Sequence, residues 1–402
     1  MKAEREYPIA VITDKGARWS GIGHPWIFGS DIQSVEPDAA DGGLVDIVTR
    51  RGQYIGTGFY NSASKITLRI VSRNANDRFD EAFWRRRVQY AWDYRRQVMP
   101  ADLSCCRVVF GEADFLPGLT ADLFTDVLVT ETLCAGIERI KPVLFPILAE
   151  VLAAGGHPIR GIYERDDMAQ RELEGLERCD GWSELVPHSG GTVTEITENG
   201  IRYRVDFENG QKTGFFLDQK YNRRAAAAIA SGRHVLDCFT HTGSFALNTC
   251  FGGAASVTAV DISAAALETA AGNAALNGAD IRFIRADVFD LLPQLRRGEY
   301  DFIILDPPAF TKSRQTVRNA AAGYREINRR AMKALPRGGY LATCSCSHFM
   351  TDTLFRREIE RAACDAEVQL RCIEGRRQSP DHPILLGAPE TEYLKFYLYQ
   401  VV

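Results

Sequence analysis

Two short motifs toward the C-terminal end of this 402-residue chain combine residue types that support covalent chemistry. In the first, DPPAF at 306–310, two prolines lack backbone N–H groups, so nearby carbonyls are free to face a substrate. Its last residue, Phe310, could stack on a base. The second, TCSCS at 343–347, places a thiol where it could act as a nucleophile, although a thiol inside a strand is usually a small core residue. Neither motif alone identifies a reaction.

A third stretch, residues 234–261, is typical of a nucleoside-binding unit. An apolar strand ends at Asp237, and the polar loop 239–243 then opens a helix at Gly243, where a missing Cβ lets the backbone approach a ligand. A second apolar strand ends at Asp261, about twenty residues on, where an acidic side chain commonly binds the ribose hydroxyls. The G-x-G-x-x-G pattern of dinucleotide sites is absent. The unit therefore favours a single adenosine, as in S-adenosylmethionine, although many α/β proteins share this pattern without such a site.

These groups need a scaffold that brings them to one edge, and the apolar pattern predicts a doubly wound α/β sheet. The strands expected after 234–261 are 281–284, 302–305, 340–343, 368–373 and 396–402. The strand ends carry Asp237, Asp261, Asp287, Asp306 and Cys344. Because such sheets bind ligands outside the carboxyl ends of their strands, a thiol and a carboxylate would lie beside an adenosine. Together these features imply covalent attack on a pyrimidine.

The chain before residue 191 is expected to form two smaller domains, which makes three domains in all. Residues 1–73 alternate short apolar runs with glycine-rich turns, a pattern typical of a small β-barrel or β-roll. Residues 74–190 combine helical and strand-like segments and predict a small α+β domain. A hairpin then turns at residues 199–200, because Asn-Gly readily supplies the positive φ angles of a type I′ turn.

The composition is typical of a globular protein, with 45% apolar and 25% charged residues. No apolar run approaches the roughly 20 residues of a membrane helix, and the N-terminus lacks the apolar core of a signal peptide. The ten cysteines show no zinc or disulfide spacing, which predicts a reducing cytoplasm and no membrane partner. The net charge of −4 indicates no polyanion partner, but arginines at 85–87 and 95–96 could contact RNA or form solvated helix faces.

Over nearly its full length the chain resembles the bacterial 23S ribosomal RNA (cytosine-C5)-methyltransferases of the large-subunit methyltransferase I type. The motifs that carry the resemblance are GHPWIF at 23–28, GEADFLPGLTAD at 111–122, IYERDD at 162–167, NGQKTGFFLDQ at 209–219, the unit at 234–261, DPPAF, TCSCS and PETEYLK at 389–395. The resemblance implies a Rossmann-like class I methyltransferase domain at 191–402. A PUA-like RNA-binding barrel at 1–73 and a small α+β (EEHEE-like) domain at 74–190 would precede it. Implied partners are S-adenosylmethionine as cofactor and 23S ribosomal RNA, while a homodimer is left open.

The resemblance also implies which residues bind the cofactor. Lys212, Phe216 and Asp218 belong to the polar loop before a predicted helix and would border the pocket. The complete expected set is Lys212, Phe216, Asp218, Asp237, Phe239, Thr242, Gly243, Asp261, Ile262, Asp287 and Asp306.

Cytosine chemistry explains why such an enzyme needs a thiol, since C5 is a poor nucleophile until a thiolate adds to C6. Cys344 is the first candidate, because Thr-Cys-Ser resembles the family's nucleophile motif, and Cys346 is the reserve. Asp306 would hydrogen-bond the N3/N4 edge of the base and stabilise developing charge. Many related enzymes remove the C5 proton with a second cysteine after the proline of the first motif. This chain has Ala309 there, so Cys346 or a water would act instead.

Two other functions are compatible with the sequence. Asp-Pro-Pro followed by an aromatic residue resembles the motif of exocyclic-amine methyltransferases, such as those making N2-methylguanine, although Ala309 intervenes before Phe310. Those enzymes need no thiol, so indifference to losing Cys344 and Cys346 would favour them. A non-catalytic RNA-binding assembly factor is the other alternative, and such a scaffold need not bind S-adenosylmethionine.

Overall fold

Residues 6–311 and 313–402 are described by a computed structural model, in which the chain forms two compact units. Unit 1 contains Met1–Ile196, Val205–Leu217 and Pro380–Thr391, and unit 2 contains Thr197–Arg204, Asp218–Ser379 and Glu392–Val402. The chain therefore passes between the units several times. The boundaries expected at 73/74 and 190/191 stay a prediction.

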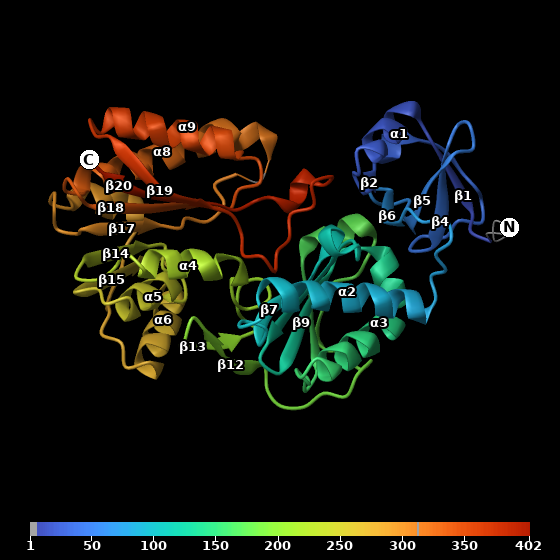
Figure 1. Cartoon of the computed structure of the whole chain (residues 1–402), viewed down its shortest axis with the longest axis horizontal. Helices are drawn as coiled ribbons and strands as arrows, with labels where there is room; N and C mark the ends of the chain where they lie inside the picture. The colour runs from blue at the N-terminus through green and yellow to red at the C-terminus, as the bar shows by residue number, and fades with distance from the viewer. Residues whose placement is uncertain (1–5, 312) are drawn as a thin grey trace. The chain divides into compact units, whose positions relative to one another are not determined.

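The first part of unit 1 is a curled six-stranded sheet with the order β2-β6-β5-β4-β1-β3 (Figure 1). Its elements are β1 (Ile9–Ile12), α1 (Asp14–Gly21), β2 (Trp26–Ile27), β3 (Ile32–Val35), β4 (Leu44–Thr49), β5 (Tyr54–Tyr60) and β6 (Leu68–Ser72). Strands β4, β5 and β6 form antiparallel pairs, and the glycines of β5 allow close packing, because a Cβ on Gly58 would lie 2.3 Å from the carbonyl oxygen of Arg69. A core of alternating aliphatic residues, including Ile12, Val45 and Leu68, fills the curl. This is the expected PUA-like domain, built as a curled sheet.

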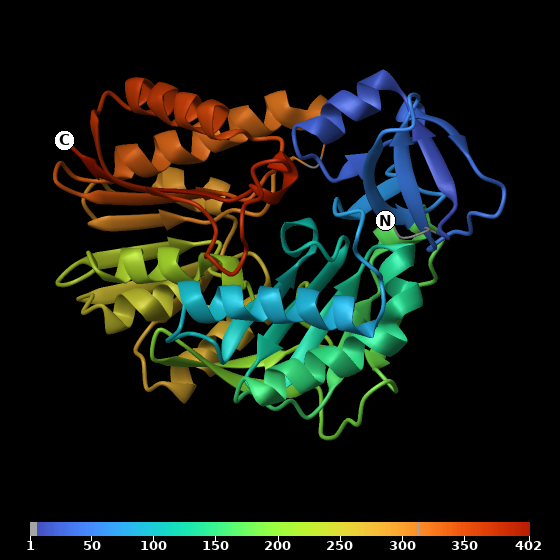
Figure 2. The same cartoon turned by 45° about the vertical axis from the view of Figure 1, so that its right-hand side comes forward.

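The second part of unit 1 is a five-stranded sheet with the order β11-β10-β9-β8-β7. Its elements are α2 (Glu81–Val98), β7 (Cys105–Phe110), β8 (Leu119–Phe124), β9 (Val127–Thr132), α3 (Ala135–Ala154), β10 (Ile162–Asp166) and β11 (Cys179–Trp182). Asp80 caps α2 by accepting a hydrogen bond from the N–H of Phe83 at 2.9 Å. Helices α2 and α3 lie side by side in Figures 1 and 2. The expected small α+β architecture is confirmed.

The hairpin formed by β12 (Val193–Glu198) and β13 (Ile201–Asp206) turns at the expected residues. Asn199 has φ 54° and Gly200 has φ 79°, the two positive angles of a type I′ turn. The turn lies in unit 2, where the Asn199 side chain donates to the backbone carbonyl of Lys220 at 3.0 Å.

Unit 2 is built on a seven-stranded sheet with the order β16-β15-β14-β17-β18-β20-β19. Its strands are β14 (His234–Cys238), β15 (Ser256–Asp261), β16 (Arg282–Arg285), β17 (Phe302–Leu305), β18 (Tyr340–Ser345), β19 (Leu370–Arg376) and β20 (Lys395–Val401). Strands β14 to β18 are parallel, and β20 runs antiparallel between β18 and β19. The order reverses at β14, which is the switch point of a doubly wound sheet.

Helices cover both faces of this sheet (Figures 1 and 2). They are α4 (Lys220–Ala227), α5 (Ser244–Phe251), α6 (Ala264–Leu276), α7 (Val288–Leu291), α8 (Val317–Ala334) and α9 (Asp352–Asp365). Helices α4, α5 and α6 lie on one face, and α8 and α9 on the other. The strands between them are buried on both sides, which explains why β17 reads as the uninterrupted apolar run Phe302–Leu305. The expected Rossmann-like architecture is confirmed.

Candidate active site

The site forms where β14, β15, β17 and β18 reach their carboxyl ends. Register places Cys238 opposite both Val260 of β15 and Leu305 of β17, while Leu305 pairs with Thr343 of β18. The loops after all four strands therefore start at one edge of the sheet. This edge contains most of the residues that the sequence singled out.

The loop after β14 has an unusual backbone. Phe239, His241 and Gly243 all have positive φ angles of 64°, 50° and 78°. Asp237 holds the loop in place, because its Oδ2 accepts the Thr240 hydroxyl at 2.6 Å and the Ala246 N–H at 3.0 Å. The loop backbone therefore folds around the Asp237 carboxylate before α5 begins.

Asp261 and Asp287 each organise the loop that follows their strand. Asp261 accepts the His241 N–H at 3.0 Å and the Ser263 N–H at 2.9 Å, which links the ends of β14 and β15. Asp287 caps α7 by accepting the Phe289 N–H at 2.8 Å. Ile262 follows β15 and is 62% exposed, so an apolar surface lies directly beside the acidic end of that strand.

Two buried oxygens in unit 2 fit a polar, cationic cofactor. Asp237 Oδ1 and Asp218 Oδ1 are buried, and neither has a hydrogen-bond partner within residues 6–311 and 313–402. Burial raises the pKa of Asp237 to about 7. Gly243 keeps the loop close to α6, since a Cβ there would meet the Ala270 Cβ at 3.0 Å. The unpaired carboxylate oxygens and the acidic end of β15 match the amino, sulfonium and ribose groups of S-adenosylmethionine.

Asp306, directly after β17, is partly exposed and lies beside the buried thiol of Cys344. Its Oδ1 accepts a hydrogen bond from Gln219 Nε2 at 2.9 Å, and Cys344 lies within hydrogen-bonding reach of both residues. Burial raises the pKa of Asp306 to about 7, and nearby Asp218 adds to the effect. The carboxyl group can therefore exchange a proton near neutral pH. The sulfur and carboxylate predicted to meet at this edge do meet.

The two cysteines of the TCSCS motif differ in their surroundings. Cys344 is inside β18, has no exposed surface, and burial together with Asp306 raises its pKa well above the usual value. Cys346 follows the strand, is partly exposed, and has its sulfur 4.0 Å from the carbonyl oxygen of Pro307. This carbonyl belongs to the DPPAF motif, whose prolines were expected to leave backbone oxygens facing the site.

Sequence reasoning gave no role to Lys395, which is 3% exposed at the start of β20. Its Nζ donates to the carbonyl oxygens of Ser347 and Tyr393, each at 2.7 Å. Burial lowers the pKa of Lys395 to about 8. Among its neighbours, Cys346 is the group that most favours the charged form of the lysine. The ammonium is thus held against the loop that carries Cys346, through its hydrogen bond to the Ser347 carbonyl. One signal was available, since this lysine is the only charged residue in the strand KFYLYQV.

Phe310 has a structural role that the sequence did not suggest. Its ring packs at 4.6 Å from the ring of buried Tyr324 and at 5.9 Å from that of Phe289. Tyr324 in turn hydrogen-bonds the Ser347 hydroxyl at 3.0 Å. Phe310 thus helps to join the DPPAF and TCSCS loops through α8, and base stacking by this ring stays a prediction.

Comparison with known proteins identifies the family. A family model described as S-adenosylmethionine-dependent methyltransferase matches residues 171–395, and a PUA-like domain model matches residues 11–73. Ribosomal RNA large subunit methyltransferase I of Klebsiella pneumoniae is 38% identical over 387 residues, 94% of each chain. The protein of the same name from Aeromonas salmonicida is 40% identical over 381 residues, 92% of this chain and 94% of the other.

The chain belongs to the ribosomal RNA large subunit methyltransferase I family. It is therefore an S-adenosylmethionine-dependent methyltransferase with an N-terminal PUA-like domain, as the motifs predicted. Two of the solved structures that share its fold illustrate the similarity. One is a proposed SAM-dependent methyltransferase from Streptococcus mutans, with a TM-score of 0.80, 20% identity and coverage of 98% of this chain and 100% of the other. The second, SMU.776 in complex with SAH, has a TM-score of 0.81, 21% identity and the same coverage.

Two residues expected at the cofactor pocket, Lys212 and Phe216, lie in unit 1. Lys212 is exposed with φ 52°, and its neighbour Thr213 donates its hydroxyl to Asp122 at 2.6 Å. Asp218 lies in unit 2, where its Oδ2 accepts the Tyr393 hydroxyl at 2.7 Å. The roles of Lys212, Phe216 and Asp218 toward the cofactor of this methyltransferase stay predictions, as does the role of Thr242, which is buried in the loop before α5.

The arginine runs of α2 do not form one exposed basic face. Arg95 is fully buried and makes a bidentate ion pair with Asp114, at 2.5 and 2.7 Å. Arg87 is partly buried and donates to the carbonyl oxygen of Val71 at 3.1 Å. Arg85 is partly exposed and Arg86 is exposed, and both are paired with acids. We expected residues 85–87 and 95–96 to extend an RNA contact. This expectation is wrong for Arg95, because its side chain is buried and its charge is paired with Asp114.

Three further features concern metal ligands, membrane-spanning helices and cysteines. Over residues 6–311 and 313–402, no group of three or more His, Cys, Asp and Glu side chains is arranged to hold a metal ion. In the same part of the chain, no helix has the length and apolarity needed to cross a membrane. All ten cysteines are free thiols.

Proposed function

We propose that this chain methylates C5 of a cytidine in 23S large-subunit ribosomal RNA through a covalent adduct between C6 of the base and a cysteine. The names of its relatives support the substrate, because they are described as ribosomal RNA large subunit methyltransferases. The observation that carries the chemistry is a partly exposed thiol, Cys346, between the DPPAF loop and a buried ammonium.

Accessibility and charge favour Cys346 over Cys344 as the nucleophile, which reverses the order expected from the sequence. A thiol must reach the base and must ionise before it adds to C6. Cys344 has no exposed surface, and both burial and the carboxyl group of Asp306 oppose its ionisation. Cys346 is partly exposed, and the ammonium of Lys395 would stabilise a thiolate there.

Asp306 would assist as a proton donor at the pyrimidine. When the thiolate adds to C6, an S–C6 bond forms and an electron pair moves from the C5–C6 double bond into the ring, toward N3 and O2. A carboxyl group with a pKa of about 7 is partly protonated at neutral pH and can donate a hydrogen bond to N3 as this charge develops. Gln219, which donates to Asp306, would keep the carboxyl group oriented.

S-adenosylmethionine, when bound, supplies an electrophilic methyl group to C5. The residues expected to hold it are those around the ends of β14 and β15, including Asp237, Gly243 and Asp261. Afterwards a base takes the proton from C5, the C5–C6 double bond forms again, and the S–C6 bond breaks to release the Cys346 thiolate. The last step regenerates the Cys346 thiolate, so one enzyme molecule can turn over repeatedly.

Single cysteine substitutions test the proposal. We expect Cys346→Ser to abolish 5-methylcytidine formation in large-subunit ribosomal RNA, measured by nucleoside mass spectrometry. Cys344→Ser should keep most of the activity, and Cys372→Ser, at an exposed site, is the matched control. Unchanged activity in both Cys344→Ser and Cys346→Ser would contradict the covalent mechanism. N2-methylguanosine as the product would favour exocyclic-amine chemistry.

A further inference from the structure

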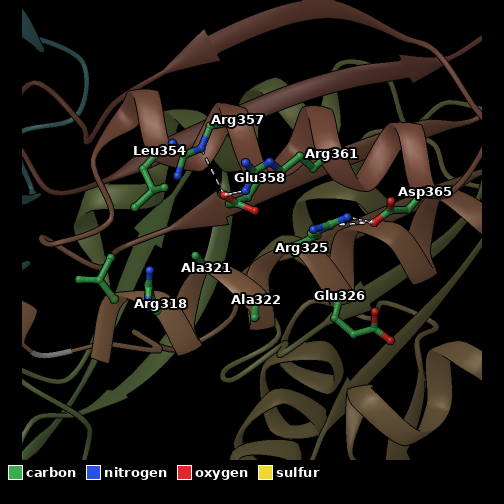
Figure 3. Close-up of a pocket in the computed structure, with 11 residues that line it drawn as sticks. Arg318, Ala321, Ala322, Arg325, Glu326, Leu354, Arg357, Glu358, Arg361 and Asp365 are labelled. Atoms are coloured by element: carbon green, nitrogen blue, oxygen red, sulfur yellow. Dashed lines mark hydrogen bonds and ion pairs between the residues drawn. The ribbon is translucent and has the colours of Figure 1, made fainter. Parts of the chain in front are cut away.

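A hollow of about 610 Å³ lies between α8 and α9 in unit 2 (Figure 3). Four arginines line it: Arg318 and Arg325 from α8, and Arg357 and Arg361 from α9. Ala321 and Ala322 of α8 also belong to the lining, and their small side chains leave space between the two helices. No step of the methyl transfer described above uses this groove.

The groove begins at the catalytic edge of the sheet. Helix α8 starts at Val317, shortly after the DPPAF motif, and α9 starts at Asp352, shortly after the TCSCS motif. Both helices therefore run away from the edge where Cys346 and Asp306 lie. Arg318 is in the first turn of α8, and Arg325 follows about 10 Å further along the helix axis, at 1.5 Å per residue. The guanidinium groups thus extend from the active-site end of the groove along its length.

Acidic residues orient these guanidinium groups without using all their hydrogen-bond donors. Glu358, whose side chain is 5% exposed, accepts from Arg361 at 3.0 Å and from Arg357 at 3.4 Å. Asp365 accepts from Arg325 across the groove (Figure 3). Arginine has five N–H donors, so each guanidinium keeps several for an anion. The side chains of Arg325, Arg357 and Arg361 are 40–56% exposed.

Positive charge predominates at the groove. Its lining contains four arginines and three acids, and the third acid, Glu326, is already paired with Arg329 and Arg330 on the same helix. Arg318 is exposed, and no hydrogen bond or ion pair joins its side chain to the described part of the chain. A groove with an excess of well-held guanidinium groups fits a chain of phosphates, for which arginine is the preferred bidentate partner.

We propose that the α8–α9 groove binds the sugar–phosphate backbone of the RNA strand next to the target nucleotide. The proposal rests on the function proposed above, since it assumes an RNA substrate whose reacting base lies at the Cys346 edge. Arg318 and Arg357 contact phosphates nearest the target, and Arg325 and Arg361 contact phosphates further along the strand. This assigns RNA positioning to the methyltransferase domain itself, in addition to the PUA-like domain.

Charge reversal of Arg318 and Arg357 tests the groove. We expect Arg318→Glu/Arg357→Glu to weaken binding of a ribosomal RNA fragment about tenfold or more at moderate salt, and to reduce the slope of log affinity against log salt by about 1.5, as two lost phosphate contacts require. The matched control is Arg282→Glu/Arg371→Glu, the same charge change at exposed positions near the starts of β16 and β19, at the opposite edge of the sheet. The control should keep the wild-type salt slope.

Two further measurements separate the possible failures. Calorimetric titration with S-adenosylmethionine should give the wild-type affinity for both double variants, and Arg318→Gln/Arg357→Gln should show the same loss of RNA binding with a smaller magnitude. Equal RNA affinity and salt slope in groove and control variants would overturn the groove proposal, while 5-methylcytidine formation by the wild type would leave the proposed function intact. A wild-type enzyme that binds the fragment through the groove but modifies no cytidine would instead overturn the proposed function.

Discussion

At the scale of single residues, the chemistry depends on which groups are exposed and which are buried. The TCSCS motif identified two thiols, but only the fold distinguishes the partly exposed Cys346 from the fully buried Cys344. Lys395 could not be assigned from sequence, because its effect depends on the antiparallel register that pairs it with Ser345. Distances between residues far apart in the chain are set by strand pairing, which local patterns do not encode.

Lys395 gives a prediction with a definite pH signature. Its pKa is lowered to about 8, so the ammonium is present below that pH and is lost as the pH rises through it. Removing the charge in Lys395→Met makes the Cys346 thiolate harder to form, and we expect methyl transfer at pH 7 to fall about tenfold, the effect of roughly one pKa unit. The rising limb of the pH–rate profile should move to higher pH.

Lys395→Arg retains a positive charge and is the matched control. We expect its pH–rate profile to stay close to that of the wild type below about pH 8, where the lysine is also charged, with unchanged affinity for S-adenosylmethionine. A loss of activity in Lys395→Met that is the same at every pH would show that the lysine only supports the fold.

At the scale of elements, periodicity predicted the parts of unit 2 well. The strands expected to end at Asp237, Asp261, Asp287 and Asp306 correspond to β14 to β17. A short apolar run between glycines and acids is typical of a strand buried in a parallel sheet. The arginines of α2 were harder to interpret. Helical spacing alone does not reveal that Arg95 packs into the interior beside Asp114.

The loop before α5 offers an element-scale prediction. Gly243 has φ 78°, and a Cβ there would meet the Ala270 Cβ at 3.0 Å, so Gly243→Ala combines backbone strain with crowding. We expect this variant to lose about 1–2 kcal/mol of stability and at least part of its affinity for S-adenosylmethionine. Thermal unfolding and calorimetric titration measure the two effects.

Gly272→Ala is the matched control. Gly272 lies inside α6 with open space around its Cα, so alanine there should stabilise the protein by up to about 1 kcal/mol and leave cofactor affinity unchanged. Equal behaviour of the two variants would contradict the role assigned to the loop geometry.

At the scale of the whole molecule, each of the two compact units is assembled from segments that are far apart in the sequence. Unit 1 includes the late segment Pro380–Thr391, which a linear division into three domains would assign to the methyltransferase domain. In that segment, Asp381 accepts the backbone N–H of Arg107 at 2.9 Å, and its carbonyl accepts from Arg95 at 2.8 Å. Such a return could not be predicted, because no local signal distinguishes it from an ordinary loop.

Asp381→Ala therefore tests the organisation of the whole chain. Loss of the buried carboxylate leaves the Arg107 N–H without this acceptor, and we expect unit 1 to lose about 1–3 kcal/mol of stability. Hydrogen exchange should accelerate in α2 and β7 and stay unchanged in β14 and β17. Asp38→Ala, at an exposed position of unit 1, is the control. Equal acceleration in both units would contradict the division described here.

The central claim is that Cys346 attacks C6 of a cytidine, and trapping the adduct tests it most directly. A ribosomal RNA fragment with 5-fluorocytidine at the target position has no C5 proton to remove, so the S–C6 bond cannot break after methyl transfer. Peptide mass spectrometry of the enzyme incubated with this RNA and S-adenosylmethionine should find the methylated nucleotide on Cys346. An adduct on Cys344, or no adduct in an enzyme that methylates the unfluorinated RNA, would contradict the account.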